Sequence, residues 1–229
     1  MDREQAVARL ETFVDHVERE TMPVPVREVW AFGDVALGLD PVERLDVYVT
    51  KDVIMGGDRE AAAEFAAEYG VKGVGTSVRA EWAEANPDRV RVSDNGYAAP
   101  EKCLAAELVD DSEGRSPSGS RTQPGDDEPI HLEVCNASFE DNVRQRLKGA
   151  LARDAYEEVL DPRGVCLWVD GTRDEEAFTR LREASLAMPT LPAALGMLGA
   201  DEGVANEAAD VLKRQRAEQE GASVRGDMV

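Results

Sequence analysis

Apolar positions in the first fifty residues follow a helical period and then a strand period. Between residues 2 and 20 they recur every three or four positions, which predicts an amphipathic helix that ends before Pro23 and Pro25. Residues 26–32 and 45–50 are short, apolar and partly β-branched, so we predict a strand in each. In the second strand the side chains alternate between an apolar face and a face that carries an acid and a tyrosine.

The rest of the chain continues this mixture of periods, with capping residues, Gly and Pro at the boundaries. The pattern predicts helices over 58–69, 77–85, 100–108, 139–160, 174–187, 191–198 and 201–219. It predicts further strands over 89–92, 130–135 and 164–169. We therefore expect an α/β (α+β) fold with a mixed sheet core and a helical C-terminal portion.

The apolar pattern disappears between residues 110 and 128, where Asp, Ser, Gly, Pro and Arg predominate. Such a segment has almost nothing to bury, so we predict a flexible acidic insert there. The insert divides the 229 residues into two parts. Residues 1–109 would form an N-terminal helix and an α/β core, and residues 129–229 would supply the remaining core strands and the helical C-terminal portion.

The chain is strongly acidic, with 47 acidic and 26 basic residues and a formal net charge of -21. Only five of the basic residues are lysine, and the acids are spread along the whole chain. Such a charge is typical of halophilic proteins, whose high internal salt screens the repulsion between acids. We interpret the chain as a haloarchaeal-type cytoplasmic protein; the alternative is an acidic protein from an ordinary cell.

The distribution of charge and hydropathy argues against two classes of partner, nucleic acids and membranes. The densest basic run, at residues 144–153, is diluted by acids, whereas a free nucleic-acid binder shows clustered Lys and Arg. We therefore do not expect nonspecific nucleic-acid binding. No stretch approaches the roughly 18 apolar residues of a membrane span, and the charged N-terminus has no signal-peptide core, so we expect no membrane association.

The three cysteines, Cys103, Cys135 and Cys166, are odd in number and widely spaced, which argues against a disulfide framework or a zinc site. His131 precedes Cys135 by four residues, but in a strand these two side chains would be about 13 Å apart. We expect thiols that pack as small apolar groups.

Two stretches, taken together, resemble the nucleotidyltransferase pattern. The first is Val29-Trp30-Ala31-Phe32-Gly33-Asp34 with the following Leu45-Asp46-Val47-Tyr48-Val49, and the second is His131-Leu132-Glu133-Val134. In that family a strand ends in Gly-Ser, a short helix follows, the next strand carries Asp-x-Asp, and a later strand carries a third carboxylate. The resemblance implies a fold in which the glycine turn admits nucleotide phosphates and the acids hold two divalent metals.

Carried over residue by residue, the resemblance makes Gly33 and Asp34 candidate nucleotide-binding residues and Asp46 and Glu133 candidate metal ligands. Two positions depart from the family: Asp34 stands where it has Ser or Gly, and Tyr48 stands where it has its second acid. The first puts a negative charge where phosphate would approach, and the second removes an anionic ligand. We therefore expect a site without efficient catalysis and assign no catalytic residue.

Longer stretches resemble a family of uncharacterised haloarchaeal proteins, a domain of unknown function. They are MPVPVREVW at 22–30, GDVALGLDP at 33–41, APEKCL at 99–104 and RGVCLWVDG at 163–171. The resemblance covers nearly the whole chain apart from the 110–128 insert. It implies lineage and a cytoplasmic location but no activity.

Three functional hypotheses follow. The leading one is a soluble haloarchaeal protein with a nucleotidyltransferase-like module that binds a nucleotide or a protein partner, without efficient transfer. The first alternative is an active nucleotidyltransferase whose Mg²⁺ or Mn²⁺ is held by Asp46 and Glu133, with Asp34 as a further ligand. The second is a structural or protein-interaction protein in which the motif is coincidence. Both nucleotide hypotheses require Asp46 and Glu133 on one face of a single sheet, near Gly33.

Overall fold

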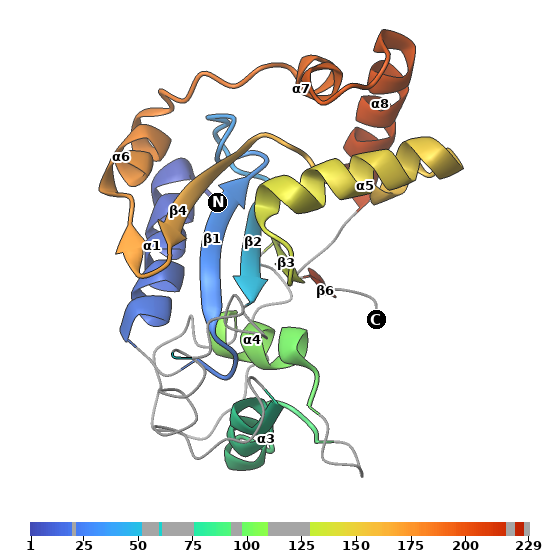
Figure 1. Ribbon diagram of the computed structural model, residues 1–229. Helices are drawn as coiled ribbons and strands as arrows, with labels where there is room; N and C mark the ends of the chain where they lie inside the picture. Colours follow the sequence, from blue (N-terminus) through green and yellow to red (C-terminus); the bar gives the residue numbers. More distant parts are fainter. Residues whose placement is uncertain are drawn as a thin grey trace.

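The computed structural model describes residues 1–19, 22–51, 60, 76–92, 98–109, 129–218 and 223–226. At its centre is a six-stranded mixed sheet with the order β5-β4-β1-β2-β3-β6 (Figure 1). The strands are β1 (Val26–Phe32), β2 (Leu45–Lys51), β3 (Ile130–Cys135), β4 (Gly164–Val169), β5 (Thr172–Arg173) and β6 (Ser223–Gly226). β1 runs antiparallel to β2 and β4, whereas β2, β3 and β6 are mutually parallel. The predicted mixed α/β class is confirmed.

Helices cover both faces of this sheet (Figure 1). The described helices are α1 (Arg3–Arg19), α3 (Thr76–Ala85), α4 (Pro100–Leu108), α5 (Phe139–Arg153), α6 (Glu175–Glu183), α7 (Leu191–Met197) and α8 (Glu202–Glu218), with a short 3₁₀ turn, η3 (Tyr156–Glu158). α1 and α6 lie against one face, and α5 lies against the other with α7 and α8 beside it. No helix among the described residues is long and apolar enough to cross a membrane.

The strands are two-faced because their side chains alternate. On one face, apolar residues of β1, β2 and β3 pack against α1 and α6 in the largest core cluster, which includes Val47, Leu132, Phe13 and Phe178. On the other face the sheet carries Phe32, Tyr48 and Cys135 against Phe139 and Val143 of α5. The polar positions of β2 and β3 lie on this second face, beneath α5 and α8.

Aromatic packing fixes α5 on the second face. The Phe139 ring stacks on Trp30 with centroids 4.8 Å apart and meets Tyr48 edge-on at 5.2 Å. Both are preferred geometries for aromatic pairs. The Ser138 side chain caps the helix by accepting from the backbone N–H of Asp141 at 3.2 Å. The start of α5 is therefore held at a set position over β2.

Several predicted boundaries are wrong, for identifiable reasons. The helix predicted over 139–160 ends at Arg153, since Asp154 adopts a left-handed conformation with φ 52°. The helix predicted over 174–187 ends at Glu183 in the same way, with Ala184 at φ 51°. In both cases the N–H of the following residue bonds to a carbonyl five residues earlier, which closes the helix.

The strand predicted over 89–92 is also wrong. Its first two backbone N–H groups, of Arg89 and Val90, bond to the carbonyl of Asn86 and form a turn after α3. The Arg89 side chain pairs with Glu107 of α4 at 3.2 Å. Local hydrogen bonding therefore takes the place of a sheet partner in this segment.

Two short strands, β5 and β6, do not follow from the apolar pattern. β5 results from a two-residue hairpin in which Asp170 and Gly171 both have positive φ, of 45° and 84°. β6 has four residues, of which only Val224 is a large apolar one, and pairs in parallel with β3. The predicted helix over 58–69 and the predicted 110–128 insert lie outside the described residues, so the division into 1–109 and 129–229 stays a prediction.

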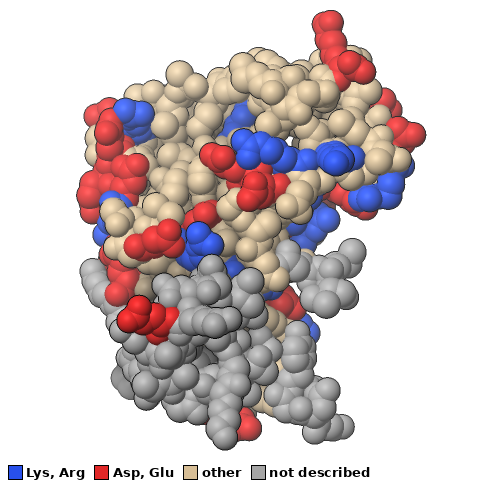
Figure 2. Space-filling view, viewed as in Figure 1, with Lys and Arg blue, Asp and Glu red and all other residues tan. Residues whose placement is uncertain are grey.

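The thiols and surface charges follow simple patterns. All three cysteines are free; Cys103 and Cys135 are buried and Cys166 is half-buried. Figure 2 shows acidic side chains gathered over α1 and α6, with both signs interspersed over the rest of the drawn face. Arginines bridge this acidic region, with Arg173 2.5 Å from Asp15 and Arg182 2.5 Å from Glu11.

Candidate functional site

Gly33 begins the turn that follows β1. Its φ of +67° is unfavourable for other residues, and a Cβ atom there would lie 2.1 Å from Asp46 Oδ2 and 2.8 Å from Arg216 Nη2. Hydrogen bonds from Leu37 N to Gly33 O and from Leu39 N to Asp34 O shape the segment as a turn, where the nucleotidyltransferase pattern has a short helix. Gly33 is thus required by the close approach of Asp46 and Arg216.

Asp34 is buried and has a structural task. Its Oδ2 accepts from the backbone N–H groups of Glu43 and Arg44 at 3.1 and 3.2 Å, which ties the turn to the start of β2. Its Oδ1 accepts from Arg216 Nη2 at 2.8 Å. The acid that departs from the family pattern is therefore fully engaged by the chain's own donors.

Asp46 is completely buried on β2, between two guanidinium groups. Arg216 Nη2 donates to Asp46 Oδ2 at 2.9 Å, and Arg44 Nη2 lies 2.6 Å from Asp46 Oδ1. Burial raises the pKa of Asp46, against the opposing effect of the charges on Arg216 and Arg44. The two arginines together provide the positive charge that a buried carboxylate requires.

Glu133 lies on β3 and has cations of its own. Arg146 of α5 donates to both carboxylate oxygens, at 3.0 and 2.6 Å, and His131 Nε2 lies 3.1 Å from Oε1. Burial alone would raise the pKa of Glu133, but hydrogen bonds from His131 and Arg146 outweigh it and lower the pKa to about 2. The other ring nitrogen of His131 lies 2.5 Å from Ser223 Oγ on β6, so the imidazole is held in place from both sides.

Tyr48 is the residue that stands where the nucleotidyltransferase pattern has its second acid. Its hydroxyl donates to the carbonyl of Ala137 at 2.8 Å and accepts from Asn142 Nδ2 at 2.9 Å. Burial raises the pKa of Tyr48, so the phenol stays neutral and cannot act as an anionic ligand. The side chain serves to connect β2 to α5.

The register of the sheet brings the candidate residues to one face. β1 and β2 are neighbours and β2 pairs with β3, with Asp46 opposite His131 and Tyr48 opposite Glu133. Asp46 and Glu133 thus share a face, next to the Gly33 turn, but each is bound to separate cations. Within the described ranges, no group of three or more His, Cys, Asp or Glu side chains is placed to hold a metal ion together.

The arginines of this cluster were not singled out from the sequence. Arg216 comes from α8, 170 positions after Asp46, and nothing in the apolar pattern of that helix marks it. Arg146 belongs to a basic run that resembles a solvated helix face. Arg44 lies two residues before Asp46, just before the predicted strand, so alternation along the chain places it on the same side as this candidate metal ligand.

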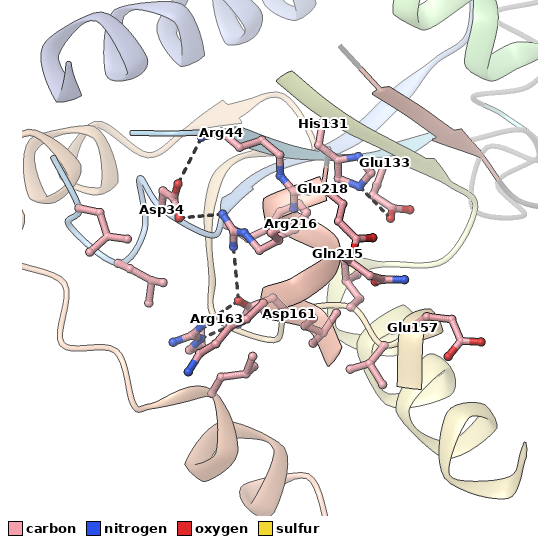
Figure 3. A pocket seen from close by; sticks show the side chains of 18 of the residues that line it. Asp34, Arg44, His131, Glu133, Glu157, Asp161, Arg163, Gln215, Arg216 and Glu218 are labelled. Atoms are coloured by element: carbon pink, nitrogen blue, oxygen red, sulfur yellow. Dashed lines mark hydrogen bonds and ion pairs between the residues drawn. The ribbon is translucent and has the colours of Figure 1, made fainter. Parts of the chain in front are cut away.

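A cleft of about 660 Å³ opens beside the cluster (Figure 3). It lies between the polar face of the sheet, the segment after η3, the start of α7 and the last turns of α8. One part of its lining is apolar and consists of Phe32, Leu37, Leu39, Val159, Leu160, Leu191, Pro192 and Leu212. The charged part includes Arg44, Arg163, Lys213, Arg216 and Arg225, together with Asp34, Glu133, Glu157, Asp161 and Glu218.

The charges of this lining are only partly paired with one another. Asp161 is buried and accepts from Arg163 Nε at 2.9 Å and Nη2 at 2.8 Å, and Arg216 Nη1 lies 4.0 Å from it. Lys213 and Arg225 have no ion pair within the described part of the chain. The cleft therefore combines an apolar wall with cationic groups available to a ligand.

Comparison of the sequence with known protein families gives a match that includes all the residues of this site. The sequence model of the Family of unknown function (DUF7095) matches residues 2–229. The chain belongs to the DUF7095 family. The match of this DUF7095 chain includes the turn with Gly33 and Asp34, the strands β2 and β3 that carry Asp46 and Glu133, and α8 with Arg216. Neither the curated proteins nor the solved structures contain a significant match to it.

The Glu133–Arg146 pair should make a measurable contribution to stability. In Glu133→Gln the charge partner of the mostly buried Arg146 is lost, and we expect the free energy of unfolding to fall by about 3 kcal/mol at pH 7. The folded pKa of Glu133 lies below its ordinary value of 4.5, so this contribution is complete above about pH 4.5 and is lost as the pH falls toward 2. Chemical denaturation of both proteins at pH 7, 4 and 3, at constant salt, measures the difference.

The control for this prediction is Glu140→Gln, also on α5. Glu140 is 65% exposed and forms only a 3.5 Å pair with Arg144, so its loss should change stability by less than about 0.5 kcal/mol. Equal effects of the two variants would mean that the Glu133 pair contributes no more than a surface pair.

Proposed function

We propose that this protein is a non-catalytic, nucleotidyltransferase-like binding module that holds a phosphorylated small ligand of the nucleotide class in the 660 Å³ cleft. The observation that carries the proposal is the position of Arg216. Its guanidinium lies between Asp34 and Asp46 in front of the Gly33 turn, where the resemblance would place a metal and a phosphate. The acidic composition supports the further proposal of a soluble, cytoplasmic protein of haloarchaeal type.

The pairing of the acids argues against two-metal transfer. That mechanism needs carboxylates that are free to bind two divalent ions. Here Asp46 is already neutralised by Arg44 and Arg216, and Glu133 by Arg146 and His131. A divalent ion at Asp46 would have to displace a guanidinium or accept it as a close like-charged neighbour, which is unfavourable in a buried site.

The cleft supports the ligand class. Its volume is within the usual range for small-molecule sites, about 300–1,000 Å³. The apolar wall suits a base or another flat apolar group. Arg163, Lys213 and Arg225 suit phosphate oxygens, because charge-assisted hydrogen bonds to phosphate are among the strongest in proteins.

The test is calorimetric titration of the full chain with ADP and ATP in molar KCl containing EDTA. We expect saturable binding, and Lys213→Gln should weaken it about tenfold through loss of one charge-assisted contact. Arg214→Gln is the matched control, because Arg214 is exposed on the same helix and does not line the cleft. Equal binding by both variants would show that ligand binding does not use this cleft.

A transfer assay separates the alternatives. Nucleotide transfer with Mg²⁺ or Mn²⁺ that disappears in Asp46→Asn would establish the active nucleotidyltransferase. If the folded protein shows neither binding nor transfer, both nucleotide hypotheses are excluded. That result would favour the structural or protein-interaction protein.

A further inference from the structure

We propose that Arg216 is a built-in counter-cation that takes the place of a divalent metal and makes ligand binding in this cleft independent of metal. Arg216 would then be the residue that determines whether the Asp34–Asp46 pair engages a guanidinium or a metal ion. The part that concerns the ligand rests on the proposed function, whereas the part that concerns the counter-cation does not.

The geometry of the bridge is the first argument. A single nitrogen, Arg216 Nη2, lies 2.8 Å from Asp34 Oδ1 and 2.9 Å from Asp46 Oδ2. One positive group thus joins two carboxylates from two elements, which is also what a bridging Mg²⁺ or Mn²⁺ does through oxygen ligands. Two carboxylates this close to a common point would otherwise repel each other and raise one pKa.

The local chain is shaped around this guanidinium. A Cβ at position 33 would lie only 2.8 and 2.9 Å from the two terminal nitrogens of Arg216. Gly33 therefore leaves room for Arg216 as well as for Asp46. The guanidinium of Arg216 therefore packs directly against the backbone of the turn, in space that a side chain at position 33 would need.

Charge balance is the second argument. When both are ionised, Asp34 and Asp46 carry two negative charges, and Arg44 and Arg216 supply two positive charges around them. Asp46 is fully buried, and Asp34 is 8% exposed. Without Arg216 the pair would keep one uncompensated charge in a nearly closed site, and such a site either takes up a cation or takes up a proton.

Arg216 also retains capacity for a ligand. Its side chain is 21% exposed and lines the cleft, and its Nη1 is 4.0 Å from Asp161, beyond hydrogen-bond distance. Figure 3 shows the guanidinium between Asp34 and Asp161, both of which line the cleft. A ligand phosphate could therefore receive hydrogen bonds from Nη1 while Nη2 stays on the carboxylates, with no metal between the protein and the phosphate.

The decisive experiment measures Mn²⁺ binding by electron paramagnetic resonance in molar KCl, without nucleotide. We compare the wild type, Asp46→Asn, Arg216→Ala, the double variant Arg216→Ala/Asp46→Asn, and Arg214→Ala as the exposed control on α8. The wild type and the control should show no Mn²⁺ site that depends on Asp46. Arg216→Ala should gain one site at least tenfold tighter than any in the wild type, and the double variant should lose it.

Two results would overturn the inference: an Asp46-dependent Mn²⁺ site in the wild type, or a folded Arg216→Ala protein without a new site. Circular dichroism reports folding, and Arg216→Gln, which keeps side-chain bulk, replaces the alanine variant if that one unfolds. The comparison of wild type with Asp46→Asn does not depend on either variant of Arg216, so it tests the counter-cation in every case.

The ligand arm uses ADP as the probe. The dissociation constant of the wild type should agree within about twofold in EDTA and in Mn²⁺, and binding that requires Mn²⁺ would contradict the inference. If ADP does not bind at all while Arg216→Ala gains its Mn²⁺ site, the counter-cation is supported and the proposed function fails.

Discussion

In molar KCl the protein is expected to melt at a temperature about 10 °C or more above that in 0.1 M KCl. The reason is the formal charge of -21, produced by 47 acids against 26 basic residues. At low salt these acids repel one another across the folded surface, and the repulsion is partly relieved by unfolding. At about 1 M salt the screening length falls to about 3 Å, so most of this penalty disappears.

Salt also weakens the attractive ion pairs, but this effect should be smaller. Many of the surface pairs are well exposed, for example Arg144–Glu140 with side chains 58% and 65% exposed, and such pairs add little to stability. The buried pairs of Asp46 and Glu133 are shielded from the solvent and are screened much less. Relief of repulsion therefore exceeds loss of attraction.

Scanning calorimetry over a KCl series measures the effect. A variant with three exposed acids neutralised, Glu84→Gln, Glu183→Gln and Asp210→Asn, should melt higher than the wild type at low salt and respond less to KCl. Sucrose at matched osmolality is the control for effects that do not depend on charge. A melting temperature that is unchanged across the KCl series would contradict the electrostatic explanation and the proposal of a halophilic protein.

The parts of the fold that follow from the sequence are those with strong local periodicity. The strand predictions over 26–32, 130–135 and 164–169 coincide with β1, β3 and β4, and β2 is one residue longer than predicted. These strands alternate apolar and polar positions or are bounded by turn residues, so local pattern and tertiary structure agree. The shared face of Asp46 and Glu133, which both nucleotide hypotheses require, follows from the register between β2 and β3 in the structure.

The rest depends on contacts that the local pattern does not record. Asp154 and Ala184 end their helices in left-handed conformations, although neither is a glycine. β6 has little apolar character and forms through backbone pairing with β3. Arg216 reaches Asp34 from 182 positions away in the chain, so the pairing that defines the site could not be read from spacing.

The candidate site shows both kinds of feature: acids that the sequence resemblance identifies, and cations that only the tertiary structure brings to them. The resemblance identifies Gly33, Asp34, Asp46 and Glu133 as candidates, and Tyr48 as a departure. In the structure, Arg216 of α8 pairs with both Asp34 and Asp46, Arg44 pairs with Asp46 from two residues before it, and Arg146 of α5 pairs with Glu133. The strands that carry Asp46 and Glu133 are thus neighbours in one sheet, while both acids are bound by cations of the chain itself.

Gly33→Ala is expected to lower the free energy of unfolding by about 3 kcal/mol. One contribution is backbone strain, because φ is +67° at this position. The other is steric, because the new Cβ would lie 2.1 Å from Asp46 Oδ2, an atom that is itself held by Arg216. Asp46 cannot move away without loosening a fully buried ion pair.

Gly196→Ala is the matched control, since a Cβ there meets nothing within 4 Å and the residue is exposed on α7. It should leave stability unchanged or raise it by about 0.5 kcal/mol, as expected for alanine in a helix. A double-mutant cycle of Gly33→Ala with Arg216→Ala, measured by urea denaturation, then isolates the contact itself. If Arg216 holds Asp46 against the turn, the alanine should cost at least about 0.5 kcal/mol less in the Arg216→Ala background, where the carboxylate can shift. Strict additivity would mean that the cost arises from the backbone conformation alone and that Gly33 is not shaped around the guanidinium.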